Sequence, residues 1–218
     1  MTTGPDSPFR PEFFRREDET PDALFYREPR LVVHIDDRAI EAVGEYFSSS
    51  LPSDGIILDL MSSWRSHLPA DFARERLIGL GLNAVELTEN PQLDDRLLAD
   101  INTVRGLPFR DSSLHAVVIT VSIQYITHPV EIFREVHRTL EDWGSLHIIY
   151  SNRMFPTKAT AIWRMLDDYE HAQLINAYFA VAGGWEQPRT LDISPHPKGS
   201  SDPVYVVSSR KMPESPPA

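Results

Sequence analysis

Short apolar runs alternate with amphipathic segments along most of this chain. The apolar runs are rich in valine, isoleucine and leucine, and each has the length of a buried strand. They occupy residues 55–60 (GIILDL), 76–83 (RLIGLGLN), 96–101 (RLLADI), 114–121 (LHAVVITV) and 145–151 (SLHIIYS). Strands that alternate with helices predict an α/β fold with a mostly parallel sheet covered on both faces. Ligands of such sheets bind at the carboxyl ends of the strands.

The amphipathic segments predict the helices. Residues 35–52 begin with aspartates suited to a helix N-terminus and repeat apolar side chains at helical spacing. Residues 129–144 begin with a proline, carry a similar apolar stripe and have Gly144 as the expected stop. The other expected elements are a helix at about 157–180 and a closing antiparallel strand pair at 183–193 and 203–209.

Length and composition predict one globular domain. The 218 residues are 41% hydrophobic, which is enough for a single core. We expect this domain to span residues 21–210, between flexible proline-rich tails at 1–20 and 211–218. No apolar run approaches the roughly 18 residues that span a bilayer, and the first residues lack a signal-peptide core. A cytoplasmic protein without membrane contact is therefore expected.

Charge and residue usage narrow the function classes. The net charge of −11 disfavours nucleic-acid binding, which needs a basic surface, so a small-molecule partner is expected. The absence of cysteine excludes disulfides, thiolate zinc sites and a cysteine nucleophile. The eight histidines show no metal-binding spacing, and no GxSxG nucleophile motif occurs. No metal is expected, and the oligomeric state is left open.

The middle of the chain carries a family resemblance. Residues 107–152 read LPFRDSSLHAVVITVSIQYITHPVEIFREVHRTLEDWGSLHIIYSN, with the strand ILDL at 57–60 before them. Together these segments resemble the class I S-adenosylmethionine-dependent methyltransferases, most closely their small type 11 domains. The resemblance implies a Rossmann-like, doubly wound α/β fold with a seven-stranded, mostly parallel sheet and a closing antiparallel pair. It also implies S-adenosyl-L-methionine as the methyl donor and a small-molecule acceptor.

The first cofactor loop departs from the family pattern. An acidic residue followed by Gly-x-Gly-x-Gly is usual there; Asp59 matches the acid, but Met61, Ser63 and Arg65 replace the glycines. Glycine permits close backbone approach and positive φ. Ser62 and Ser63 are expected to cap a following helix and to donate to a ligand carboxylate. Arg65 is expected to pair with that carboxylate.

Trp64 has two interpretations at this loop. Its indole either fills the space for the methionine part of the cofactor or walls that space from the side, and we expect the wall. The first alternative turns the protein into a scaffold that has lost its ligand.

The second and third strands hold the remaining expected cofactor contacts. The family's ribose-binding acid aligns with Gly81, and Asn83 follows two residues later. Asn83 either hydrogen-bonds a ribose hydroxyl or caps a helix at 84–90. Asp100, with Ile101 beside it, matches the family's adenine-binding acidic position.

Candidate chemistry lies where a substrate approaches these strand ends. Methyl transfer needs alignment more than covalent help, and a base only when the acceptor loses a proton. His34 is one candidate base, although a hydrogen-bonded structural histidine is the commoner outcome. The catalytic candidates are His34, Gln124 and Tyr125, and the substrate-binding candidates are Tyr26, Trp64, His67, Asn152 and Arg153.

Two function classes remain. The first is a divergent S-adenosylmethionine-dependent methyltransferase that acts on a small molecule. The second is a non-catalytic binding module on the same fold, supported by the lost glycines and the missing ribose acid. A nicotinamide-dependent oxidoreductase is disfavoured because the phosphate-binding glycine pattern and the ribose carboxylate are both absent.

Overall fold

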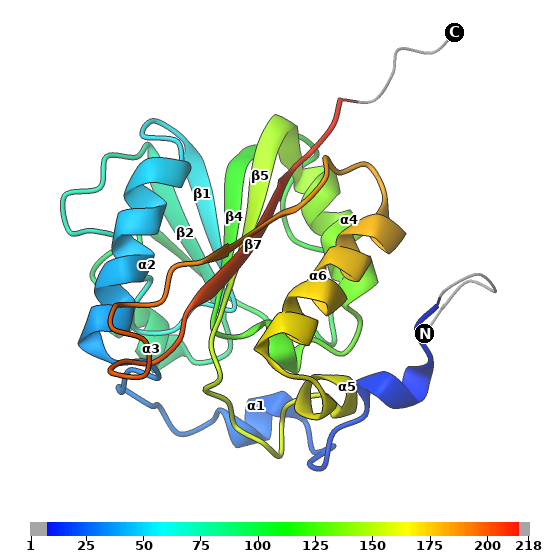
Figure 1. Ribbon diagram of the computed structural model, residues 1–218. Helices are drawn as coiled ribbons and strands as arrows, with labels where there is room; N and C mark the ends of the chain where they lie inside the picture. The colour runs from blue at the N-terminus through cyan, green and yellow to red at the C-terminus, as the bar shows by residue number, and fades with distance from the viewer. Residues whose placement is uncertain (1–7, 214–218) are drawn as a thin grey trace, which may run out of the picture.

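A computed structural model describes residues 8–213, and a seven-stranded sheet forms its centre (Figure 1). The strand order is β3-β2-β1-β4-β5-β7-β6. The strands are β1 (Ile56–Leu60), β2 (Arg76–Gly81), β3 (Asp95–Leu98), β4 (Leu114–Thr120), β5 (Leu140–Tyr150), β6 (Arg189–Asp192) and β7 (Tyr205–Arg210). The first five pair in parallel, and β7 pairs antiparallel with both β5 and β6. The predicted doubly wound sheet with a closing antiparallel pair is confirmed.

Both faces of the sheet are apolar, which explains the uninterrupted hydrophobic runs. Alternate residues of each strand point to opposite faces, so Leu58 and Val117 join one core while Ile57 and Ala116 join the other. The first core is covered by α4 (Pro129–Thr139) and α6 (Asp168–Ala182), and the second by α2 (Asp37–Ser50) and α3 (Ala84–Glu89) (Figure 1). Within residues 8–213 no helix has the length and apolar character needed to cross a membrane.

The expected end of the helix at 129–144 is wrong. The α4 helix ends at Thr139, and Leu140 already has extended backbone angles at the start of β5. Between Leu140 and Ser145 the pairing of β5 with β4 is irregular, and Trp143 has a positive φ of 66°. Gly144 therefore lies in a tight strand irregularity, where a Cβ would lie 2.9 Å from the carbonyl oxygen of Glu141.

The stretch expected as one helix at 157–180 contains two. The short α5 (Ala161–Met165) ends before Asp167, whose carboxylate accepts from the backbone N–H of Glu170 and starts α6. The N–H of Asp167 in turn donates to the carboxylate of Glu170, which completes a capping box. This cap redirects the chain within an otherwise helical pattern.

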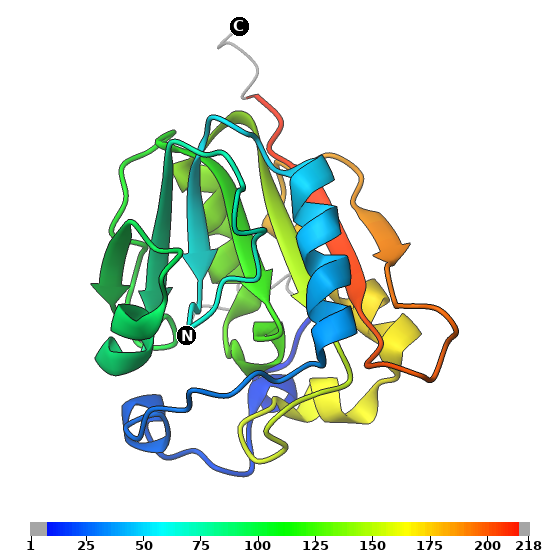
Figure 2. The same cartoon turned by 90° about the vertical axis from the view of Figure 1, so that its left-hand side faces the viewer.

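Residues 8–36, here called the strap, run beneath the carboxyl ends of the strands (Figure 2). The expectation of a flexible tail at 1–20 is wrong for residues 8–20. Phe9 is buried and packs edge-on against Tyr178, with ring centroids 5.2 Å apart. The backbone of Asp18 bonds to Thr157. At the other end Lys211, which was expected in the C-terminal tail, is buried and donates to the carbonyl of Leu140. Residues 1–7 and 214–218 lie outside the described part.

A buried charge cluster holds the strap in place. Asp22, in the short helix α1 (Asp22–Phe25), is 4% exposed and accepts two 2.8 Å hydrogen bonds from Arg16. Lys158 is fully buried, lies 3.3 Å from Asp22 and donates to the carbonyl oxygen of Thr20 at 2.6 Å. Asn102, after β3, also donates to Asp22 at 2.9 Å. The cluster therefore joins the strap to two loops at the strand ends.

The connection from β1 to β2 contains no helix in the structure, so Ser62 and Ser63 do not cap one. The backbone instead turns at Met61, with φ of 64°, and the N–H of Ser62 bonds to the carbonyl of Leu80 in β2. The turn lays the loop directly on Gly81, where an added Cβ would overlap the carbonyl oxygen of Ser62. An acidic side chain at position 81 is therefore sterically excluded.

We predict that Lys158→Met lowers the free energy of unfolding by about 3–5 kcal/mol, because it removes one partner of a buried ion pair. Urea denaturation followed by circular dichroism measures this change. Lys198→Met is the matched control: Lys198 pairs with Asp192 at an exposed site and contributes less than about 1 kcal/mol. Equal effects of the two substitutions would contradict the anchoring role of Lys158.

We also predict that Gly81→Ala costs about 1–3 kcal/mol or more, because backbone atoms of the Ser62 loop must move. Gly44, inside α2, is the control. Its added Cβ would meet its nearest atom at 3.6 Å, so Gly44→Ala is expected to stabilise by about 0.5–1 kcal/mol. Thermal unfolding of both variants compares them, and a tolerated Gly81→Ala would contradict the close approach.

Candidate cofactor and substrate cavity

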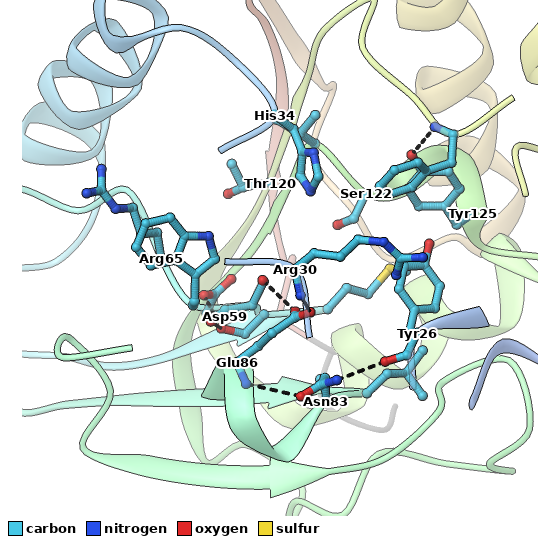
Figure 3. Close-up of a pocket in the computed structure, with 18 of the residues that line it drawn as sticks. Tyr26, Arg30, His34, Asp59, Arg65, Asn83, Glu86, Thr120, Ser122 and Tyr125 are labelled. Atoms are coloured by element: carbon cyan, nitrogen blue, oxygen red, sulfur yellow. Dashed lines mark hydrogen bonds between the residues drawn. The ribbon is translucent and has the colours of Figure 1, made fainter. Parts of the chain in front are cut away.

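A cavity of about 590 Å³ lies between the strap and the carboxyl ends of β1 to β4 (Figure 3). Its size falls in the range that holds a small organic ligand or cofactor. The strand ends line one side of the cavity, and the strap lines the opposite side. The lining includes most of the residues expected from the sequence, namely Tyr26, His34, Asp59, Met61, Ser62, Ser63, Trp64, Arg65, His67, Asn83, Asp100, Ile101, Tyr125 and Arg153.

Asp59 lies at the end of β1 and is 3% exposed. One of its carboxylate oxygens accepts hydrogen bonds from the hydroxyls of Ser62 and Ser66, both at 2.6 Å. Burial raises the pKa of Asp59 to about 6, against the two serine hydrogen bonds, which lower it. The serines of the loop therefore hold the Asp59 side chain.

Trp64 stands in the cavity wall. Its indole N–H donates to the backbone carbonyl of Val32 in the strap at 2.8 Å. The guanidinium of Arg65 lies over the indole ring, 4.6 Å from its centroid, on the exposed side. The loop that replaces the glycines thus closes one side of the cavity against the strap and leaves its volume open.

Asn83 is the N-cap of α3. Its side-chain oxygen accepts from the N–H groups of Val85 and Glu86, and its amide donates to the carbonyls of Tyr26 and Arg27. All the hydrogen-bonding groups of this side chain are engaged, which matches the capping interpretation and leaves no donor for a ribose hydroxyl.

Glu86, which was not expected from the sequence, lines the cavity and is 8% exposed. One carboxylate oxygen accepts from the backbone N–H of Arg30 at 2.7 Å, and the other accepts from the Ser63 hydroxyl at 2.7 Å. Glu86 therefore joins α3 to the strap and to the β1 loop (Figure 3). An acidic residue in the first turn of a helix gives no sequence signal that separates this role from ordinary helix charge.

Asp100 follows β3 and is half-buried at the cavity floor. One oxygen accepts from the backbone N–H of Asn102 at 2.9 Å, and no residue among 8–213 bonds to the other. Burial, together with the negative charge of Asp22, raises the pKa of Asp100, while the bond from Asn102 lowers it. Ile101 is buried beside it and supplies apolar surface.

The two lining histidines differ in exposure. His34, in the strap, is the more exposed of the two and packs edge-on against Phe155 at 5.2 Å. Partial burial and the charge of Arg30 lower the pKa of His34, against the charge of Glu86, which raises it. His67 is more enclosed, and burial, then the charge of Arg65, lowers its pKa to about 4. Both imidazoles are therefore neutral at pH 7, and His67 is a weak base because burial opposes its protonation.

Only some of the candidate residues after β4 and β5 line the cavity. The hydroxyl of Tyr125 accepts from the N–H of Phe155 at 2.8 Å, and Tyr125 lines the cavity. Gln124 does not: it is 1% exposed, and its amide donates to the carbonyls of Val121 and Arg153. Asn152 is exposed and also lies outside the cavity lining.

Arg153 lines the cavity rim but already has a partner. Its guanidinium bonds to Asp202 at 2.6 Å, and Asp202 also accepts from the backbone N–H of Asp36. Asp36 in turn accepts from the N–H of Asp202 and the hydroxyl of Ser201, and these bonds hold the pKa of its carboxyl at about 2. The group closes the end of the strap against the β6–β7 loop.

Several buried polar atoms in the cavity lining have no hydrogen-bond partner among residues 8–213. Buried polar groups in folded proteins are nearly always paired, so such atoms mark a place where a ligand or water completes the bonding. They are Thr120 Oγ1, Ser122 Oγ, His67 Nδ1 and one terminal nitrogen of Arg30. Thr120 ends β4 and Ser122 follows it, and Figure 3 shows both beside the same space as His34.

We predict that Asp59→Asn gains stability relative to the wild-type protein as pH rises. The folded carboxyl, with its raised pKa, holds its proton more tightly than the unfolded one, so the wild type pays to ionise it between about pH 4 and pH 6. The free energy of unfolding of the variant minus that of the wild type is expected to be about 2–3 kcal/mol larger above pH 7 than at pH 4. Urea unfolding at pH 4.5, 6 and 7.5 measures the difference, and parallel pH profiles would contradict the raised pKa.

A comparison with protein families supports the resemblance noted in the sequence. Residues 67–148 match the family model described as "Methyltransferase domain". The biotin biosynthesis bifunctional protein BioHC of Teredinibacter turnerae is 26% identical over 89 residues. That alignment covers 40% of this chain and 15% of the longer protein, so it concerns a domain and not the whole relative.

Solved structures share the fold at low sequence identity. An S-adenosylmethionine-dependent methyltransferase from Mesorhizobium loti superposes with a TM-score of 0.55 at 14% identity, covering 78% of this chain and 98% of that one. One from Leishmania major gives a TM-score of 0.58 at 16% identity, covering 79% and 72%. The 4+2 cyclase SpnF gives 0.57 at 17% identity, covering 82% of each chain.

SpnF shares this fold and is named as a cyclase, not as a methyltransferase. The fold alone therefore does not decide the chemistry. The family match and the sheet order nevertheless agree. The predicted resemblance is thereby confirmed as one of fold and domain match: residues 67–148 match a methyltransferase domain model, and the chain shares the fold of solved S-adenosylmethionine-dependent methyltransferases.

Proposed function

We propose that the cavity binds S-adenosyl-L-methionine and that the protein transfers its methyl group to a small molecule. The observation that carries this proposal is Asp100, a half-buried carboxylate at the end of β3 with one oxygen open to the cavity. A carboxylate at this place can accept a hydrogen bond from the exocyclic amine of adenine. Ile101 adds an apolar surface for the base.

The other lining residues also fit the cofactor, in an altered arrangement. Gly81 leaves no room for a ribose-binding acid, because the Ser62 carbonyl lies against it. Glu86 is the carboxylate that lines the cavity on the same side, and each of its oxygens retains a second lone pair. The unpartnered hydroxyls of Thr120 and Ser122 are available to polar groups of the cofactor.

Bound S-adenosylmethionine supplies an electrophilic methyl group, whose transfer to an acceptor lone pair leaves the bonding electrons on sulfur as a thioether. The protein's part is to align the acceptor and to exclude water. Trp64 and the strap enclose the cavity for this purpose. His34, neutral at pH 7 by its lowered pKa, is placed to take the proton that an O–H or N–H acceptor loses.

A second candidate is a binding module that does not transfer methyl groups. The missing helix after β1 favours it, because that helix would present its positive N-terminus to the cofactor's carboxylate. On this view the cavity holds a different ligand and Asp100 is structural.

We predict that S-adenosylhomocysteine binds the wild-type protein and that Asp100→Ala weakens this binding by about 1–3 kcal/mol, the cost of deleting one buried hydrogen-bond partner. Isothermal titration calorimetry measures both affinities. Asp95→Ala is the matched control, because Asp95 begins the same strand at its opposite end and pairs with exposed Arg76.

Three outcomes separate the candidates. No heat and no thermal stabilisation with millimolar S-adenosylhomocysteine would refute the methyltransferase proposal. Binding that Asp100→Ala leaves unchanged, with a lowered melting temperature, would assign Asp100 to structure. Binding without methyl transfer to any of a panel of small molecules, tested with labelled cofactor, would favour the second candidate.

A further inference from the structure

Arg30 is a cation of the cavity wall that has no carboxylate partner within residues 8–213. Its guanidinium lies 4.6 Å from the ring centroid of Phe25, 5.4 Å from that of Tyr26 and 5.3 Å from that of Phe155. These cation–π contacts stabilise the charge through the rings. The guanidinium also donates a 2.9 Å hydrogen bond to the backbone carbonyl of Phe25.

The edge of the guanidinium remains incompletely bonded. One terminal nitrogen donates to Phe25, whereas the other is buried and donates to no atom among residues 8–213. Three aromatic rings lie near the guanidinium, whose planar array of N–H donors is suited to binding a carboxylate through two parallel hydrogen bonds. A half-buried cation without a counter-ion is costly, so an anionic ligand would relieve that cost.

The neighbouring carboxylates have other ion-pair or hydrogen-bond partners, and none of them bonds to the Arg30 guanidinium within residues 8–213. The partners are Arg16 and Lys158 for Asp22, Arg153 for Asp202, and the Ser63 hydroxyl and the Arg30 backbone N–H for Glu86. The other lining arginine without an ion pair in the described chain is Arg65, which is exposed and stacked on Trp64. Arg30 is therefore the enclosed positive site of this cavity.

Arg30 also lies beside the candidate base. Phe155 contacts the Arg30 guanidinium at 5.3 Å and the His34 ring at 5.2 Å, so the two side chains share one aromatic neighbour. Figure 3 shows both side chains directed into the same part of the cavity, with Tyr26 and Tyr125 at its side. An anion held by Arg30 would thus sit among aromatic rings and within the region of His34.

We propose that Arg30 binds the carboxylate of the methyl acceptor, so that the acceptor is a small carboxylic acid with an apolar or aromatic body. The identification of the bound acid as the methyl acceptor rests on the proposed function, whereas the carboxylate site itself rests on Arg30 and the aromatic rings around it. The carboxylate of the cofactor's methionine part is a second source of the same chemistry, and the experiment distinguishes the two sources.

The probes are benzoate and its neutral isostere benzamide, titrated by NMR into the full chain with and without saturating S-adenosylhomocysteine. The wild-type protein is expected to bind benzoate at least tenfold more tightly than benzamide in both conditions. Arg30→Met is expected to abolish this preference, and Arg30→Lys to retain part of it, because lysine keeps the charge but loses the planar pair of donors. Arg65→Met is the matched control and is expected to keep the preference.

Equal binding of benzoate and benzamide by the wild type, or an equal loss in Arg65→Met, overturns the carboxylate site. Titration of S-adenosylhomocysteine and of 5′-methylthioadenosine, which lacks the amino-acid carboxylate, tests the second source. If Arg30→Met weakens the binding of S-adenosylhomocysteine tenfold or more and leaves that of 5′-methylthioadenosine unchanged, Arg30 binds the carboxylate of the cofactor. The assignment to the acceptor is then overturned. If neither nucleoside binds the wild type, the proposed function fails, while the benzoate preference still decides the anion site. Thermal unfolding of Arg30→Lys controls for loss of fold.

Discussion

The buried ion pair between Asp22 and Lys158 determines how much of this fold becomes a cavity. Strand ends of an open α/β sheet form only a shallow crevice, and a covering segment is needed to enclose a ligand. Asp22 accepts from Arg16 and Asn102 as well as facing Lys158, so one carboxylate ties the strap to the loops after β3 and β5. Without this tie, the short helix α1 would have little apolar surface to hold it, and Tyr26, Arg30 and His34 would lose their common position.

A steric constraint on the opposite side of the cavity explains two departures from the family pattern at once. The loop after β1 turns at Met61 and lies on Gly81. One backbone arrangement therefore accounts both for the missing glycine at position 61 and for the missing ribose-binding acid at position 81. Met61 accepts a left-handed backbone at a cost of about 1–2 kcal/mol, which the serine bonds to Asp59 and the pairing of Ser62 with Leu80 help to offset. The residues therefore form a consistent alternative loop in place of a damaged glycine loop.

The errors of sequence-based prediction fall where side-chain contacts override local preference. Gly144 looks like a helix stop, yet α4 ends five residues earlier because the backbone at Leu140 must already pair with β4. The serines at 62 and 63 look like helix caps, but they bind Asp59 and Glu86 across the sheet edge. Gln124 looks like a substrate residue and instead bonds to two backbone carbonyls. Strand register decides the first of these outcomes, and partners distant in sequence, Glu86 for Ser63 and Arg153 for Gln124, contribute to the other two.

The sequence by itself determined the layered fold, the strand ends as the site and the family resemblance, because hydrophobic period and turn chemistry are local properties of the chain. It also singled out Asp59, Asp100 and the Trp64 wall. Only the tertiary structure decided that residues 8–20 pack, that Asn83 is a cap, and that Glu86, Lys158 and Arg30 shape the cavity. Those roles arise from residues brought together from distant parts of the chain, 136 positions apart for Asp22 and Lys158, and no local pattern carries that information.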